Sequence, residues 1–125
     1  MNRQEFESKL KQANPIGSVI KNPGRGTSEI VAFPDGRISY VRGSSTISVS
    51  LDDLYHAYTE FRGRRVSSSD LKSFAPSVFD SAARPSGHSC NCTFFFLALE
   101  CASLASDLKG EGVRGSPYSV QLLDA

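Results

Sequence analysis

The chain has 125 residues, of which 39% are hydrophobic and 22% charged, a balance typical of one globular domain with its own core. Its formal net charge of +1 excludes a broad electrostatic attraction to nucleic acid or to an anionic membrane, so any basic surface must be local. Three cysteines are an odd number, and the first dozen residues are charged rather than apolar. Both features favour a cytoplasmic protein over a secreted one stabilised by disulfides.

The first segment is expected to form a short helix over residues 2–13. Asn2 can cap this helix, and Phe6 and Leu10 share one face at the i, i+4 spacing. Pro15 ends it, because the residue before a proline is pushed out of the helical region. A weak strand and a loop that contains Arg25 are expected over residues 16–27.

Residues 29–50 carry the clearest local signal, a three-stranded antiparallel β-meander. Apolar and polar residues alternate along each strand, as in a sheet with one face buried and one exposed. Glycine lies in both connecting turns, where a positive φ is often required. The expected strands are residues 29–33, 38–42 and 46–50, and the turns are residues 34–36 and 43–45.

Helices are expected to follow the meander. Ser50 can cap a helix that ends near Phe61, and the serines at positions 67–69 can cap a second one that Pro76 breaks. A long central helix is predicted over residues 91–108. The six apolar residues from Phe94 to Leu99 make this helix apolar on every side, which is typical of a buried helix.

The last segment, residues 117–123, alternates apolar residues and is expected to form a short strand that docks on the edge of the sheet. The predicted fold is therefore a single α+β domain over residues 1–125, in which the meander and three or four helices surround the central helix. The longest apolar run is too short to cross a membrane.

The leading functional hypothesis is nucleic-acid binding without catalysis. The dipeptide Arg-Gly recurs four times, and a glycine beside an arginine lets the backbone approach a phosphate while the guanidinium makes forked contacts. The basic segment between the two helices resembles the turn of a helix-turn-helix in its spacing. The expected contacts are Arg62, Arg64, Arg65 and Lys72, with Arg25 and Arg42 as outer phosphate contacts.

An alternative is a thiol-dependent enzyme or a thiol-sensitive site. His88, Cys90 and Cys92 lie where a loop enters the central helix, and the positive end of a helix dipole can favour a thiolate. The simpler interpretation is that Cys92 is a small buried apolar residue and that His88 orders the loop. A metal site at this segment, with Cys101 or His56 as a fourth ligand, is disfavoured because no second ligand pair follows.

A second alternative is a regulatory module that binds a protein or a small anionic ligand and forms a homo-oligomer. Four tyrosines, Tyr40, Tyr55, Tyr58 and Tyr118, could anchor such an interface together with arginines, although core packing explains Tyr55 and Tyr58 better. No cofactor or metal is predicted. Of the three hypotheses, nucleic-acid binding is the one that we carry forward.

Overall fold

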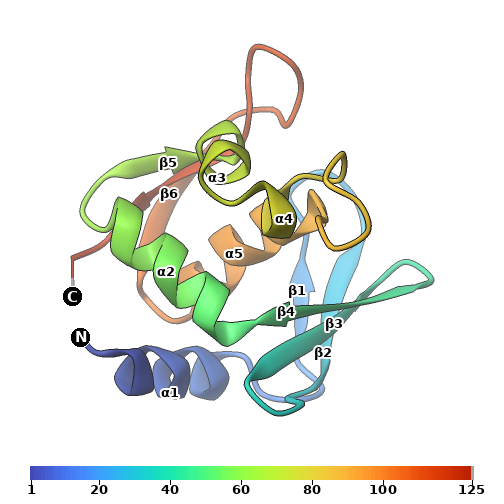
Figure 1. Cartoon of the computed structure of the whole chain (residues 1–125), viewed down its shortest axis with the longest axis vertical. Coiled ribbons are helices and arrows are strands. Elements are labelled where there is room, and N and C mark those ends of the chain that lie inside the picture. The colour runs from blue at the N-terminus through green and yellow to red at the C-terminus, as the bar shows by residue number, and fades with distance from the viewer. Residues whose placement is uncertain (125) are drawn as a thin grey trace.

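The computed structural model describes residues 1–124, and its fold is α+β, as predicted (Figure 1). The buried apolar side chains form one cluster to which helices and strands from the whole chain contribute. In chain order the elements are α1 (Arg3–Ala13), β1 (Val19–Lys21), β2 (Thr27–Ala32), β3 (Arg37–Arg42), β4 (Ser45–Ser50), α2 (Leu51–Phe61), β5 (Arg65–Ser67), α3 (Ser68–Phe74), α4 (Pro76–Phe79), α5 (Cys90–Cys101), β6 (Ala105–Lys109) and β7 (Ser119–Leu122).

The first sheet has the strand order β1-β2-β3-β4, and every neighbouring pair is antiparallel. The predicted meander is confirmed, but the sheet is one strand larger than expected. The additional strand is β1, which lies within the weak strand and loop expected over residues 16–27 and pairs Val19 with Glu29. Gly36 and Gly43 occupy the two predicted turns with φ values of 69° and 61°, which glycine adopts without steric cost.

Helix α5 lies in the centre of the fold, as its sequence predicts. Phe94, Phe95 and Phe96 are each 2% exposed or less. The Phe94 ring stacks on Tyr40 of β3 with a centroid distance of 4.0 Å, and the Phe95 ring packs edge-on against Phe79 of α4. Different elements cover different sides of the helix, which is why it is apolar all round.

The predicted end of the central helix at residue 108 is wrong, because α5 ends at Cys101. The chain leaves the helix through Ser103, whose φ of 60° is left-handed, and the Leu104 N–H donates to the carbonyl of Leu99. This bond closes the helix as in a Schellman-type cap, with serine where glycine is usual. Leu104 is fully buried, so the turn sends the apolar pattern on into β6.

A second sheet, with the strand order β5-β7-β6, was not predicted. The expected C-terminal strand exists as β7, but it is the centre of this sheet and not an edge strand of the meander. Val66 of β5 pairs with Val120 of β7, and both side chains are fully buried. The expected turn between α2 and the next helix is therefore partly a strand, held in place by residues more than fifty positions later in the chain.

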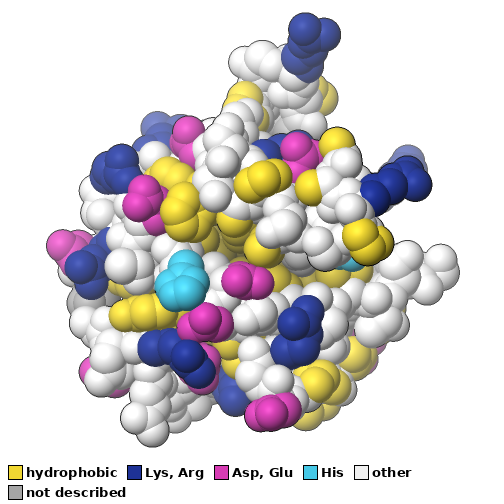
Figure 2. Space-filling model, viewed as in Figure 1, with side chains coloured by type: hydrophobic (Ala, Val, Ile, Leu, Met, Phe, Trp, Pro, Cys, Tyr) yellow, Lys and Arg dark blue, Asp and Glu magenta, His cyan; other side chains and the backbone are white. Residues whose placement is uncertain are grey.

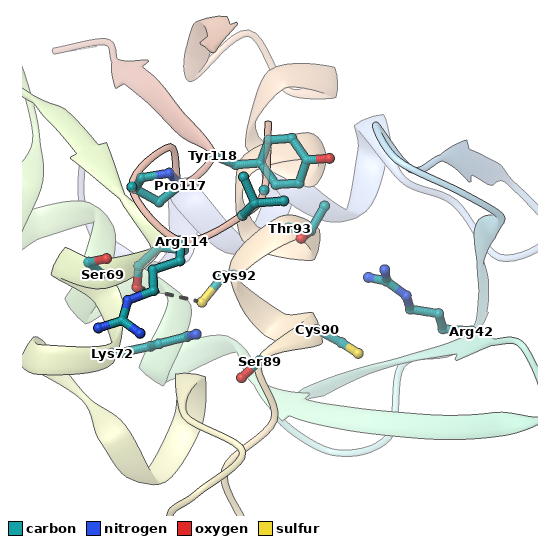
Figure 3. Close-up of a pocket in the computed structure, with 14 residues that line it drawn as sticks. Arg42, Ser69, Lys72, Ser89, Cys90, Cys92, Thr93, Arg114, Pro117 and Tyr118 are labelled. Atoms are coloured by element: carbon teal, nitrogen blue, oxygen red, sulfur yellow. Dashed lines mark hydrogen bonds between the residues drawn. The ribbon is translucent and has the colours of Figure 1, made fainter. Parts of the chain in front are cut away.

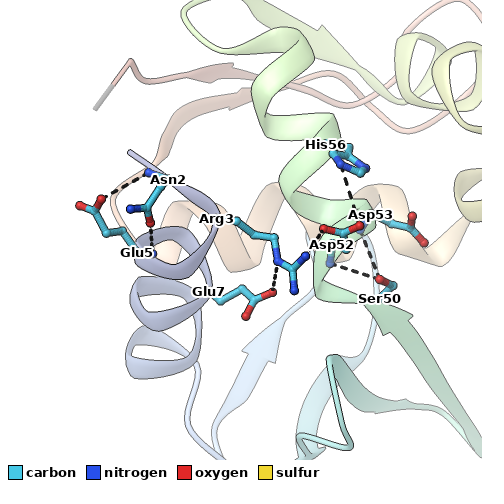
Figure 4. A network of polar contacts seen from close by, with 8 residues as sticks. All are labelled: Asn2, Arg3, Glu5, Glu7, Ser50, Asp52, Asp53 and His56. Carbon is cyan, nitrogen blue, oxygen red and sulfur yellow. Dashed lines mark hydrogen bonds and ion pairs between the residues drawn. The ribbon is translucent and has the colours of Figure 1, made fainter.

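Helices α1 and α2 are joined by exposed polar contacts and by the buried contact of Phe6 with Tyr55 and Tyr58. Asn2 and Glu5 form a capping box at the start of α1, and Arg3 bonds to Glu7 at 3.2 Å and to Asp52 of α2 at 3.0 Å (Figure 4). Exposed pairs of this kind each contribute about 0–1 kcal/mol to the free energy of unfolding. The fully buried Phe6 side chain beneath them holds α1 more strongly.

The surface on the side shown in Figure 2 carries cationic and anionic side chains interspersed with one another. This pattern agrees with the near-neutral net charge of +1. Within residues 1–124, no helix is both long enough and apolar enough to cross a membrane.

Candidate functional site

The start of α5 is tied to the two elements beside it. Asn91 is only 2% exposed, and its Oδ1 accepts a hydrogen bond of 2.7 Å from the Tyr40 hydroxyl of β3. Its Nδ2 donates to the carbonyl of Val78 in α4 at 2.9 Å. Because both ends of the amide are bonded, the first turn of α5 has a defined position, and with it the neighbouring residue Cys90.

Two adjoining hollows open beside this first turn. The Lys72 hollow has a volume of about 500 Å³, and the Arg25 hollow has a volume of about 650 Å³. Arg42 and Cys90 line both, so the two hollows meet at these residues. We call the two together the basic groove, because cationic side chains line its length: Arg25, Arg42, Lys72 and Arg114.

Four separate segments bring these cations together. Arg25 lies in the loop between β1 and β2, and Arg42 is the last residue of β3, directly before the turn at Gly43. Lys72 belongs to α3, and Arg114 lies in the loop between β6 and β7. Figure 3 shows Lys72 and Arg114 on one side of the start of α5 and Arg42 on the other. No two of these residues are close in sequence.

The lining of the groove suits an anion. Within the described part of the chain, no aspartate or glutamate lines either hollow. Hydroxyl groups accompany the cations in the Lys72 hollow, from Ser68, Ser69, Ser89 and Thr93. Guanidinium, ammonium and hydroxyl groups are the side-chain donors that phosphate oxygens accept from.

The N-terminus of α5 adds to this polarity. Ser89, its N-cap residue, makes no side-chain cap bond to the helix and instead accepts from the backbone N–H of Ser81 at 3.2 Å. The partial positive charge at the start of a helix favours anionic groups nearby. This contribution is secondary, because the four cationic side chains carry full charges.

The predicted arginines of the inter-helix segment lie outside the groove lining and have partners of their own. Arg62 pairs with Asp124 at 3.3 Å, and Arg65 pairs with Asp107 at 2.7 Å. Arg64 donates to the carbonyl of Glu60, and its guanidinium lies over the ring of Phe61. Nucleic-acid contact by these three arginines stays a prediction, but it would compete with the existing contacts.

The other predicted residues do come together. Arg25, Arg42 and Lys72 all line the basic groove, and Arg114 joins them. Arg114 belongs to the last of the four Arg-Gly pairs in the sequence, and it was not among the predicted contacts. Of the four Arg-Gly pairs, the three at Arg25, Arg42 and Arg114 line the groove, and the pair at Arg62 does not. The repeated Arg-Gly dipeptide was therefore the sequence signal for these cations, and only the fold shows which of its arginines line the groove.

The cysteines near the start of α5 differ in their surroundings. Cys90 is half-buried and lines both hollows. Cys92 is 2% exposed, and its Sγ donates to the carbonyl of Phe79 at 3.5 Å. Burial raises the pKa of the Cys92 thiol to about 12, which disfavours the thiolate at neutral pH. A catalytic role for Cys92 stays a prediction. His88 lines the Arg25 hollow beside Cys90.

The residues considered for a metal site are separated in the fold. Cys101 lies at the far end of α5 from Cys90, and His56 lies on α2 with its Nε2 3.9 Å from Asp52. Among residues 1–124, no group of three or more histidine, cysteine, aspartate or glutamate side chains is placed to hold a metal ion.

Two of the four tyrosines proposed as interface anchors are internal, and the other two, Tyr55 and Tyr118, are partly exposed. Tyr40 and Tyr58 are fully buried, and the Tyr58 hydroxyl donates to the carbonyl of Leu123 at 2.8 Å. Tyr118 lines the Lys72 hollow and is partly exposed. A homo-oligomer stays a prediction, and neither Tyr40 nor Tyr58 is available to form it.

Comparison with known proteins identifies no relative: no protein-family model, no curated protein and no solved structure matches this chain. The functional argument therefore starts from the groove itself.

Proposed function

We propose that the basic groove binds the phosphate backbone of a single-stranded nucleic acid. The observation that carries this proposal is the convergence of four cations from four segments on two adjoining hollows: Arg25, Arg42, Lys72 and Arg114. Within the described residues no carboxylate lines the groove, so an anion bound there would meet no like charge from its walls. Positively charged grooves that follow the backbone are typical of proteins that bind single strands.

The concave shape supports a single strand over a duplex. A duplex is a stiff cylinder that is read by a helix or ribbon inserted into its groove. Helix α3, with only seven residues, instead contributes Lys72 to the wall of a hollow. Single strands are flexible, and their phosphates and bases can enter hollows of about 500 Å³ and 650 Å³.

The proposed partner is still a nucleic acid, as predicted, but the proposed interface is the basic groove instead of the segment between α2 and α3. Arg65 donates to the Ser119 hydroxyl at 2.9 Å as well as pairing with Asp107, so it serves as a connection within the second sheet. Arg42, Lys72 and Arg25 have no carboxylate beside them in the groove lining. Cations without a nearby counter-charge are the better phosphate contacts, because no ion pair must be broken.

The test is fluorescence anisotropy with labelled oligothymidylate and oligouridylate at several salt concentrations. We expect R42A/K72A to bind at least tenfold more weakly than the unsubstituted protein. Each lost phosphate contact lowers the slope of log affinity against log salt by about 0.7, so the double variant should lose about 1.4. The matched control is K9A/K11A, which removes two lysines of α1, a helix that lines neither hollow. Equal affinities for the two variants would show that the groove is not the interface.

Cys90 favours a second candidate function, thiol chemistry beside the bound anion. The observation behind it is the position of Cys90, half-buried in the first turn of α5 and shared by both hollows. We expect iodoacetamide to alkylate Cys90 faster than Cys101 at pH 7, although Cys101 is the more exposed thiol, because cationic side chains line both hollows beside Cys90 and the anionic Glu100 neighbours Cys101. Mass spectrometry of the modified peptides measures both rates. Alkylation of Cys90 no faster than that of Cys101 would remove this candidate.

A further inference from the structure

The Lys72 hollow has an apolar wall in addition to its cations. Val113, Pro117 and Tyr118 line it together with Arg42 and Lys72. Figure 3 shows the rings of Pro117 and Tyr118 along one side of the hollow, beyond the start of α5. Val113 is 57% exposed, so its apolar side chain is accessible to a ligand in this hollow. A phosphate group has no apolar surface that could pack against this wall.

The Tyr118 ring is held by backbone on two sides. A methyl group added at Gly112 would lie 2.3 Å from Cε2 of the ring, and the φ of 73° at this position also favours glycine, so the loop between β6 and β7 passes close to the ring. A methyl group added at Gly24 would lie 3.2 Å from the Tyr118 hydroxyl, which places the ring against the loop between β1 and β2 as well. The Tyr118 carbonyl accepts from the Ser68 N–H at 3.0 Å. These contacts place the hydroxyl end of the ring between the two loops, while the side chain stays partly exposed.

We propose that Tyr118, with Pro117 and Val113, forms a stacking subsite for one nucleobase, while Arg42 and Lys72 hold the adjacent phosphate. This inference rests on the proposed function, and it names what the ligand must contain beyond phosphate. A nucleotide unit joins a flat base with an apolar face to an anionic group, and the hollow offers both kinds of wall within about 500 Å³. Aromatic side chains stack bases with little dependence on sequence.

The Arg25 hollow lacks this wall. Among the described residues, no phenylalanine, tyrosine or tryptophan lines it, and its lining combines Arg25, Arg42 and His88 with Ile47 and small or polar residues. We therefore expect the two hollows to bind different parts of the strand. One base stacks in the Lys72 hollow, and the backbone continues past Arg42 into the Arg25 hollow.

Three probes of equal length test the inference: oligothymidylate, an abasic oligodeoxynucleotide and inorganic polyphosphate. We expect the protein to bind oligothymidylate about tenfold more tightly than the abasic strand, the size of effect that one base–aromatic stack provides. Tyr118→Leu should reduce the affinity for oligothymidylate to that for the abasic strand and leave the affinity for polyphosphate unchanged. Tyr118→Phe, which keeps the ring, should retain the preference.

A second variant reports stacking directly and keeps an aromatic ring at the site. The chain contains no tryptophan, so Tyr118→Trp introduces a single indole fluorophore. Its fluorescence should be quenched by oligothymidylate and not by polyphosphate or by the abasic strand. Equal affinity of the unsubstituted protein for base-containing and abasic strands would overturn the subsite and leave the groove proposal standing. Failure to bind any of the three probes would overturn both.

Discussion

The hydroxyl of Tyr40 donates a 2.7 Å hydrogen bond to Oδ1 of Asn91, and this bond joins the interior of the first sheet to the start of the central helix. The Tyr40 ring also stacks on Phe94 in the same helix. Burial raises the pKa of the Tyr40 hydroxyl well above its ordinary value, so the proton needed for the bond is present throughout the physiological range. This buried hydrogen bond therefore connects β3 and α5, the two elements that carry Arg42 and Cys90 of the basic groove.

Tyr40→Phe tests this contact. It removes one oxygen and leaves Oδ1 of Asn91 buried without its donor, which should lower the free energy of unfolding by about 1–3 kcal/mol. Urea denaturation followed by circular dichroism measures the change. The matched control is Tyr55→Phe, because the Tyr55 hydroxyl lies on a partly exposed side chain at 3.5 Å from its acceptor. A loss for Tyr40→Phe as small as for the control would show that the bond contributes little.

Alkaline pH should destabilise the fold partly through Cys92. Burial raises the pKa of its thiol from 9.0 to about 12, so between these values the folded state keeps a proton that the unfolded state releases. Stability is therefore lost as pH rises through this window, by at most about 1.4 kcal/mol per pH unit from this one group. Cys92→Ala should flatten the fall in urea midpoint between pH 9 and 10.5. An identical pH dependence in that variant would contradict the assignment.

The end of α5 can be tested at Ser103, whose φ of 60° is a conformation that residues with a side chain adopt at a cost. Ser103→Gly should raise the free energy of unfolding by about 0.5–1 kcal/mol, because glycine removes that cost and loses part of the gain to its more flexible unfolded chain. The control is Ala102→Gly, at a position with a negative φ of −87°, which should be destabilising. Thermal and urea unfolding report both changes.

The groove and the inter-helix segment make opposite predictions for arginine substitutions. If the strand lies in the groove, R42A/K72A weakens nucleic-acid binding, and R62A/R64A leaves it within about twofold, because Arg62 and Arg64 already have protein partners. Anisotropy titrations of both variants in one buffer decide between the two locations. A larger loss for R62A/R64A would return the interface to the inter-helix segment.

Local signals predicted much of the secondary structure. The capping residues Asn2, Ser50 and Ser67 all cap helices, and the two glycine turns of the meander lie where expected. These features depend on side chains within a few residues of one another, so the sequence shows them directly. The apolar run of α5 likewise predicted its burial.

The end of α5 and the second sheet could not be predicted in the same way. No glycine or proline follows Cys101 at once, and a helix that is apolar all round has no periodicity that would mark its end. Strand β5 has three residues and depends on β7, which lies more than fifty residues later. A strand so short is stable only in a sheet, and its partner is a long-range choice.

The candidate site shows the same division. The sequence by itself determined an α+β fold, a buried central helix, and a set of arginines next to glycines in loops. Only the tertiary structure decided which cations share a surface: it paired Arg62 and Arg65 with carboxylates and brought Arg25, Arg42, Lys72 and Arg114 together. The physical reason is that capping, turn geometry and burial follow from neighbouring residues, whereas the convergence of charges depends on where distant loops are placed by the core beneath them.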